Sequence, residues 1–114
     1  EDAKAWGSRI VTDAELRRHG MAAVVDTIPE GAECLVTIDC DGLDPAVMPA
    51  VNMPTPGGPD YGDVLELLQG VARRGRIAGV NLVELVPARD PTGLGALTAA
   101  RLVCSAIGLI HAAR

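Results

Sequence analysis

Three aspartates lie within six residues, in the run Asp39-Cys40-Asp41-Gly42-Leu43-Asp44. Ionised carboxylates this close repel one another, and a bound cation removes that penalty because it takes their oxygens as ligands. Side chains alternate along an extended segment, so Asp39 and Asp41 are expected on one side, with Cys40 facing the packed interior. Carboxylate oxygens suit magnesium, calcium or manganese better than metals that prefer sulfur. The spacing therefore predicts a divalent-metal site that includes Asp39 and Asp41.

Other uses of these aspartates have to be weighed. Asp-rich loops often cap a turn and the following helix, and spacing alone leaves this alternative open. A calcium-binding EF-hand loop is excluded, because Asp44 and Ala50 stand where it needs glycine and glutamate. A phosphohydrolase of the haloacid dehalogenase type also carries D-x-D-G after an apolar strand, and Asp39 would be its nucleophile. Against that reading, Leu43-Asp44-Pro45 follows the glycine, and the sequence has no downstream paired-aspartate motif.

Alternating strands and helices are expected to position these residues. Residues 34–38 form a mostly β-favouring apolar run, which is typical of a parallel strand covered on both faces. The loop at 40–59 is long and rich in proline and glycine, and such loops tend to be functional. The order β-α-β-α-β-α predicts a parallel sheet flanked by helices. Predicted strands cover residues 5–11, 34–38 and 77–85, and predicted helices cover residues 13–26, 60–74 and 94–113.

Glu84 is the second candidate for chemistry. Ligands of an open parallel sheet bind beyond the carboxyl ends of its strands. Asp39 and Asp41 follow one predicted strand, and Glu84 stands near the end of the next. We therefore expect the three carboxylates at one edge of the sheet. A role for Glu84 in capping a nearby loop is the alternative.

The composition narrows the class of protein. A chain of 114 residues makes one domain at most, and its net charge of −5 argues against a nucleic-acid partner. Three cysteines without C-x-x-C spacing predict reduced thiols in a cytoplasmic protein. The apolar stretch at 102–113 is too short to span a membrane and predicts a buried helix. Because the chain begins at Glu1 rather than Met, we expect it to be a piece of a longer protein.

Several segments resemble one enzyme family. Residues 37–45, Thr-Ile-Asp-Cys-Asp-Gly-Leu-Asp-Pro, resemble the S-x-D-x-D-G-L-D-P signature of the ureohydrolases, which include agmatinase, arginase, guanidinobutyrase and formimidoylglutamase. Residues 83–90 resemble the family's v-E-x-x-P-x-x-D segment. Residues 98–102 are similar to the start of its final helix, and residues 17–20 to its agmatinase branch. Two departures are Thr37 in place of serine, and residues 50–53 in place of G-T-G-T before Pro54.

This resemblance implies a fold and a set of site residues. The fold is a three-layer α/β/α arrangement with a parallel sheet, the arginase-like fold. Residues 1–114 would be the carboxyl-terminal part of its single domain, as a partial β-α-β-α-β-α unit. Asp39 would bridge two Mn²⁺ ions and Asp41 would chelate one of them, while a hydroxide held between the metals attacks the guanidinium carbon. Glu84 would orient the substrate guanidinium. Asp44 is expected to accept hydrogen bonds from loop amides instead of binding metal.

The resemblance also implies an activity, which is hydrolysis of a linear guanidino compound, agmatine above all, to urea and an amine in polyamine metabolism. Val51, Asn52 and Met53 are candidates for the wall of the substrate pocket, although Met53 is equally compatible with loop packing. The family's other ligands, two His and two Asp, come from upstream motifs, so neither His19 nor His111 is expected to bind metal. We therefore expect the isolated chain to be inactive and the intact protein to be a trimer or hexamer.

Overall fold

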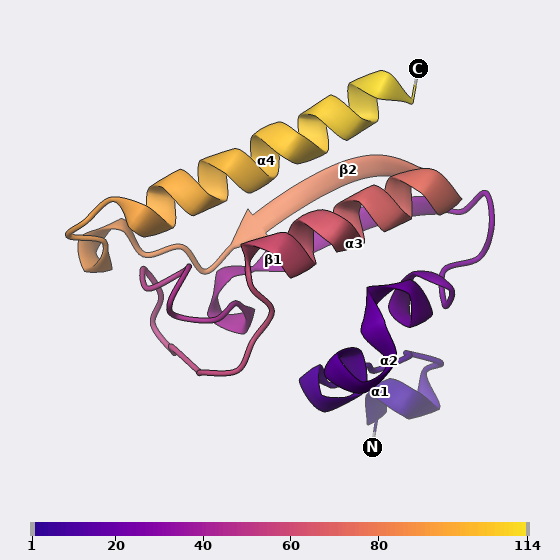
Figure 1. Ribbon diagram of the computed structural model, residues 1–114, viewed down its shortest axis with the longest axis horizontal. Helices are drawn as coiled ribbons and strands as arrows, with labels where there is room; N and C mark the ends of the chain where they lie inside the picture. The colour runs from indigo at the N-terminus through magenta and orange to yellow at the C-terminus, as the bar shows by residue number, and fades with distance from the viewer. Residues whose placement is uncertain (1, 114) are drawn as a thin grey trace.

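A two-stranded parallel sheet with helices packed on it forms the centre of the molecule (Figure 1). The computed structural model describes residues 2–113. The α/β class predicted from the sequence is confirmed, and from β1 onward the chain runs β-α-β-α. In chain order the elements are α1 (Asp2–Ala5), α2 (Asp13–Val25), β1 (Glu33–Asp39), the 3₁₀ turn η1 (Cys40–Gly42), α3 (Tyr61–Arg74), β2 (Arg76–Val83), the 3₁₀ turn η2 (Pro87–Arg89) and α4 (Leu94–Ala112).

One face of the sheet carries the core. Along β1, Cys34, Val36 and Ile38 turn toward the helices, whereas Leu35 and Thr37 are exposed, Leu35 to 75%. Buried side chains of α3, α4 and both strands belong to one apolar cluster. Within residues 2–113, helices therefore cover one face of the sheet. The sequence predicted that both faces would be covered, and the second face is exposed in the described chain.

Helices α2 and α3 begin where capping residues in the sequence mark them. The Asp60 carboxylate accepts a hydrogen bond from the Asp63 backbone N–H at 2.9 Å, and the Asp63 carboxylate accepts one from the Asp60 N–H at 3.0 Å. Thr12 and Glu15 make the same reciprocal arrangement before α2. Each pair satisfies backbone donors that a helix start otherwise leaves unpaired. Gly20, with a φ of 77°, puts a kink inside α2.

Helix α4 is buried along one side only. It has 19 residues and a mean hydropathy of 1.6, so by length and composition it passes as a membrane-spanning helix. Its residues Leu102 and Ala106 are nevertheless fully buried in the core cluster. On its other side, Leu97 and Ile107 are 58% and 60% exposed. The predicted buried helix is therefore a one-sided core helix in the described part of the chain.

The predicted strand at residues 5–11 is wrong. Residues 2–5 form α1, and residues 8–12 have no regular structure. Ile10 is 53% exposed, and the sheet of the described residues consists of β1 and β2. A strand needs a neighbour for its backbone N–H and C=O groups, and β-branched residues alone do not supply one.

We predict that Leu102→Ala lowers the free energy of unfolding of the chain by about 2–5 kcal/mol, because it leaves a cavity in the core. Urea unfolding followed by circular dichroism measures the change. Leu97→Ala, at an exposed position of the same helix, is the matched control, with an expected loss of about 0.5 kcal/mol or less. Equal losses for the two variants would contradict this placement of the core.

Candidate functional site

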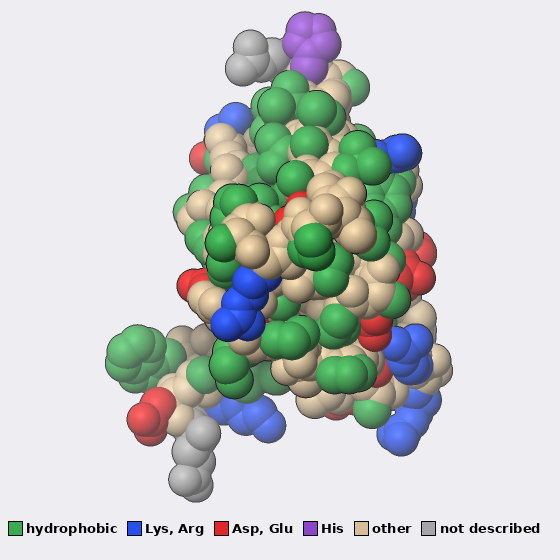
Figure 2. All heavy atoms as spheres, turned by 90° about the vertical axis from the view of Figure 1, so that its left-hand side faces the viewer, with side chains coloured by type: hydrophobic (Ala, Val, Ile, Leu, Met, Phe, Trp, Pro, Cys, Tyr) green, Lys and Arg blue, Asp and Glu red, His purple; other side chains and the backbone are tan. Residues whose placement is uncertain are grey.

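The two strands end at the same edge of the sheet. In their parallel register Asp39 lies opposite Val83, so Glu84 follows β2 at the level where Cys40 and Asp41 leave β1. The loops that follow both strands lie on one side of the molecule (Figure 1). The face on that side mixes apolar side chains with acidic and basic ones (Figure 2). The structure thus places Asp39, Asp41 and Glu84 where parallel sheets bind their ligands.

Asp39 and Asp41 are each oriented through one carboxylate oxygen. Oδ1 of Asp39 accepts a hydrogen bond from the Asp41 backbone N–H at 3.1 Å, which starts η1. Oδ1 of Asp41 accepts one from the Met53 N–H at 3.3 Å. Within residues 2–113 neither Oδ2 atom accepts a hydrogen bond. Asp39 therefore does cap a turn, and the expected extended alternation stops there. One oxygen of each carboxylate remains without a hydrogen bond from the described residues.

Cys40 points away from this edge, as the sequence predicts. Its side chain is fully buried in the core cluster. Burial, followed by the negative charges of Asp39, Asp41 and Glu84, raises the pKa of the thiol to about 11. The thiol is therefore protonated at neutral pH.

Asp44 organises the loop after β1. Its Oδ1 accepts a hydrogen bond from the Ala46 N–H and its Oδ2 one from the Gly57 N–H, both at 2.9 Å. These two bonds lower the pKa of the Asp44 carboxyl below its ordinary value of 3.8. Both oxygens are engaged by backbone amides, which confirms the predicted structural role.

The segment at residues 50–53 divides into a buried and an exposed half. Val51 is 1% exposed and belongs to the core, so its predicted place in a pocket wall is wrong. The cause is the bond from the Val86 N–H to the Ala50 carbonyl oxygen, at 2.7 Å, which draws this part of the loop against the chain after β2. Asn52 and Met53 are exposed, Met53 to 69%, so loop packing does not account for Met53 in the described chain.

Glu84 has an unusual backbone conformation. Its φ is 63°, a left-handed value that no other described non-glycine residue adopts. Such a conformation costs on the order of 1 kcal/mol and is often found at functional sites. The Glu84 carboxylate is exposed and accepts no hydrogen bond from residues 2–113, so the loop-capping alternative is not observed there. Sequence patterns carried no signal for this backbone conformation.

The donor set fits part of a metal site. No three His, Cys, Asp or Glu side chains of the described residues gather closely enough to hold a metal ion. Two carboxylates with one unengaged oxygen each suit a hard divalent cation. Within the described residues, Asp39 and Asp41 thus offer two of the oxygen ligands that such a cation needs, and no third ligand accompanies them.

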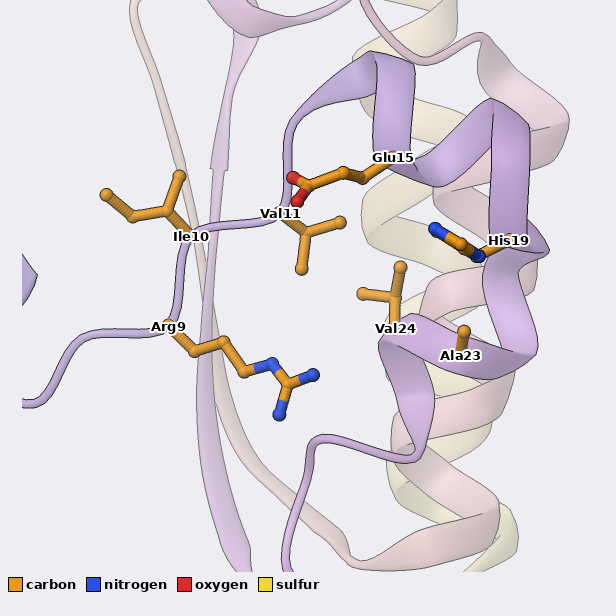
Figure 3. Close-up of a pocket in the computed structure, with 7 residues that line it drawn as sticks. All are labelled: Arg9, Ile10, Val11, Glu15, His19, Ala23 and Val24. Carbon is orange, nitrogen blue, oxygen red and sulfur yellow. The ribbon is translucent and has the colours of Figure 1, made fainter.

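The two histidines lie elsewhere. His111 is in the last turn of α4, at the end of that helix farthest from the strand ends (Figure 1). His19 borders a separate hollow of about 350 Å³ between the segment before α2 and α2 itself (Figure 3). The carboxylate of Glu15 in this hollow is engaged by Thr12. The hollow is lined by Arg9, Ile10, Val11, Glu15, His19, Ala23 and Val24.

The sequences that match this chain belong to one family. The profile described as "Arginase family" matches residues 1–108. N(1)-aminopropylagmatine ureohydrolase of Thermus thermophilus is 40% identical over 109 residues, covering 94% of this chain and 36% of that protein. Agmatinase of Chromobacterium violaceum is 31% identical over 91 residues, covering 80% of this chain and 28% of that protein. The chain thus spans about a third of the length of these curated relatives.

Solved structures agree with the predicted fold. Proclavaminate amidino hydrolase from Streptomyces clavuligerus matches with a TM-score of 0.90 at 28% identity, covering 99% of this chain and 38% of that one. Arginase from Bacillus subtilis matches with a TM-score of 0.79 at 29% identity, covering 93% of this chain and 39% of that one. These matches confirm an arginase-like α/β fold, of which the chain forms a part.

We predict that Glu84→Gly is more stable than Glu84→Ala by about 1 kcal/mol, because glycine adopts a positive φ without steric cost. Urea unfolding of the two variants measures the difference, and both lack the carboxylate, so its charge does not enter the comparison. Equal stability of the two would show that residue 84 does not have the left-handed conformation described.

Asp44 should contribute to the pH dependence of stability. The pKa of Asp44 is lower in the folded chain than in the unfolded chain. The stability that Asp44 contributes is therefore fully present above its pKa in the unfolded chain, and it is lost as the pH falls through its lower pKa in the folded chain. We expect Asp44→Asn to lower the urea midpoint of unfolding at about pH 6. The drop in this midpoint between about pH 6 and about pH 3 should also be smaller in the variant. Glu66→Gln, on an exposed position of α3, is the control. A pH profile for Asp44→Asn that matches the control would rule out this role.

Proposed function

The chain belongs to the arginase family, and we propose that the full-length protein hydrolyses a linear guanidino compound to urea and an amine. Agmatine is the first substrate to test, because relatives named for agmatine or its aminopropyl derivative are among the matches. Since the chain covers about a third of these relatives, the activity is assigned to the full-length protein.

One observation carries this proposal. At the carboxyl end of the sheet, Asp39 and Asp41 are each fixed through Oδ1 and keep Oδ2 unengaged within the described chain. Glu84 follows the position paired with Asp39, and its carboxylate is likewise unengaged. This arrangement supports the proposal, because two aspartates with unengaged oxygens can hold a cation and a third carboxylate nearby can bind a cationic guanidinium.

We propose that Asp39 and Asp41 would both be manganese ligands in the full-length protein. When bound, such ions supply a water nucleophile that ionises near neutral pH. Further ligands would come from parts of the protein outside this chain. The protein environment of Asp41 limits its rotation, because the Met53 N–H holds one of its oxygens.

Glu84 is proposed to accept hydrogen bonds from the substrate guanidinium. A planar guanidinium presents pairs of N–H donors that match the two oxygens of a carboxylate, and the charge strengthens both bonds. The left-handed backbone at Glu84 sets the direction in which this side chain leaves the strand. Asn52 and Met53, exposed on the neighbouring loop, are proposed to contact the rest of the substrate.

The alternative of a phosphohydrolase with Asp39 as nucleophile has no support from the comparisons. The matched proteins described above are named as ureohydrolase, agmatinase, amidino hydrolase and arginase. Phosphorylation of Asp39, trapped with beryllofluoride, would favour that alternative. A protein that binds no manganese, releases no urea and is not phosphorylated at Asp39 would favour a third alternative, a non-catalytic α/β module.

We expect the full-length protein with manganese to release urea from agmatine. Asp39→Asn and Asp41→Asn should each lower kcat/KM by about 100-fold or more, because loss of a direct ligand costs at least as much as loss of a ligand's supporting contact. Urea formation and bound manganese are both measured. Asp2→Asn, on exposed α1, is the matched control.

The isolated 114-residue chain tests whether ligands from outside it are needed for activity. It should bind manganese weakly and release no urea, since two carboxylates do not complete a site for two ions. Measurable urea release by the isolated chain would contradict this. Failure of the manganese-loaded full-length protein to hydrolyse agmatine, arginine or guanidinobutyrate would contradict the proposed function.

A further inference from the structure

The segment at residues 50–53 is held from both strand ends. Its first residue accepts the Val86 N–H, from the chain after β2, at 2.7 Å. Its last residue donates its N–H to Asp41, in the turn after β1, at 3.3 Å. The segment therefore connects the proposed metal ligand Asp41 with the chain that follows β2 and includes Glu84.

Arg89, in η2, holds the middle of this segment. Its Nη1 donates to the carbonyl oxygens of Val51 and Asn52, at 3.4 and 3.3 Å. No ion pair joins Arg89 to a carboxylate of residues 2–113. Its positive charge is therefore directed at two backbone carbonyls instead of an acidic side chain.

The second of these contacts reaches Asp41 through a single rigid group. The carbonyl of Asn52 and the N–H of Met53 belong to the same planar peptide, and the described peptides are all trans, so the two groups point to opposite sides. Arg89 binds one side of this peptide and Asp41 binds the other. A cation on the carbonyl also polarises the N–H, which makes it a stronger donor to the carboxylate.

We propose that Arg89 is a positioning residue that fixes the Asn52–Met53 peptide and thereby the orientation of Asp41 toward its metal ion. The inference rests on the proposed function for the identity of the metal. Arginine suits this place because one guanidinium nitrogen reaches two carbonyls while the planar group stays fixed, which a flexible lysine does less well.

The test uses the full-length protein loaded with manganese. Arg89→Ala should speed hydrogen–deuterium exchange at the Met53 amide by about 10-fold, because a charge-assisted bond to its peptide is lost. Manganese binding, measured by titration, should weaken by about 10-fold or more, as for other contacts that orient a ligand. Arg89→Lys should recover only part of both changes, because lysine keeps the charge but holds the peptide less firmly. Arg73→Ala, at an exposed position near the end of α3, should alter neither.

The outcomes separate this inference from the proposed function. Unchanged exchange at Met53 in Arg89→Ala, or unchanged manganese affinity, overturns the role of Arg89 whether or not the protein makes urea. Faster exchange and weaker manganese binding in a protein that hydrolyses no guanidino compound support Arg89 and overturn the function. Excess manganese should restore kcat in Arg89→Ala, and a loss of kcat that persists at saturating metal also overturns the positioning role.

Discussion

The parallel pairing of β1 with β2 is the constraint on which the site depends. It sets Asp39 opposite Val83, so the carboxylates that follow the two strands come to one edge without any direct bond between them. Like charges so placed repel, and the backbone pairing of the strands has to overcome that repulsion in the absence of a cation. A slip in this register would change the level of Glu84 relative to Asp39 and Asp41.

The loop between β1 and α3 keeps its shape through bonds from side chains to backbone. Asp44 binds two amides, and the Thr98 hydroxyl of α4 donates to the Val47 carbonyl at 2.9 Å. The Asp90 carboxylate accepts N–H groups at the start of α4, from Gly95 at 3.0 Å and from Ala96 at 2.7 Å. The last helix thus supports the loop and is itself anchored next to the proposed site.

Much of this arrangement follows from sequence patterns. Apolar runs and capping residues located β1, β2, α2, α3 and α4, and the spacing of Asp39, Asp41 and Glu84 placed them at one edge. The patterns failed where a residue's state depends on distant neighbours. The segment at 5–11 has the composition of a strand, but no strand of the described chain lies beside it. Val51 is buried because the chain after β2 is hydrogen-bonded to the neighbouring Ala50. The positive φ of Glu84 leaves no trace in composition.

The open sheet has a consequence for handling the chain alone. Within residues 2–113 each strand has a partner on one side only, and the uncovered face of β1 presents Leu35 at 75% exposure. An edge strand presents unpaired backbone N–H and C=O groups, onto which a second molecule can add its own strand. We therefore expect the isolated chain to associate through this strand edge, and a charged residue in place of Leu35 to reduce that association.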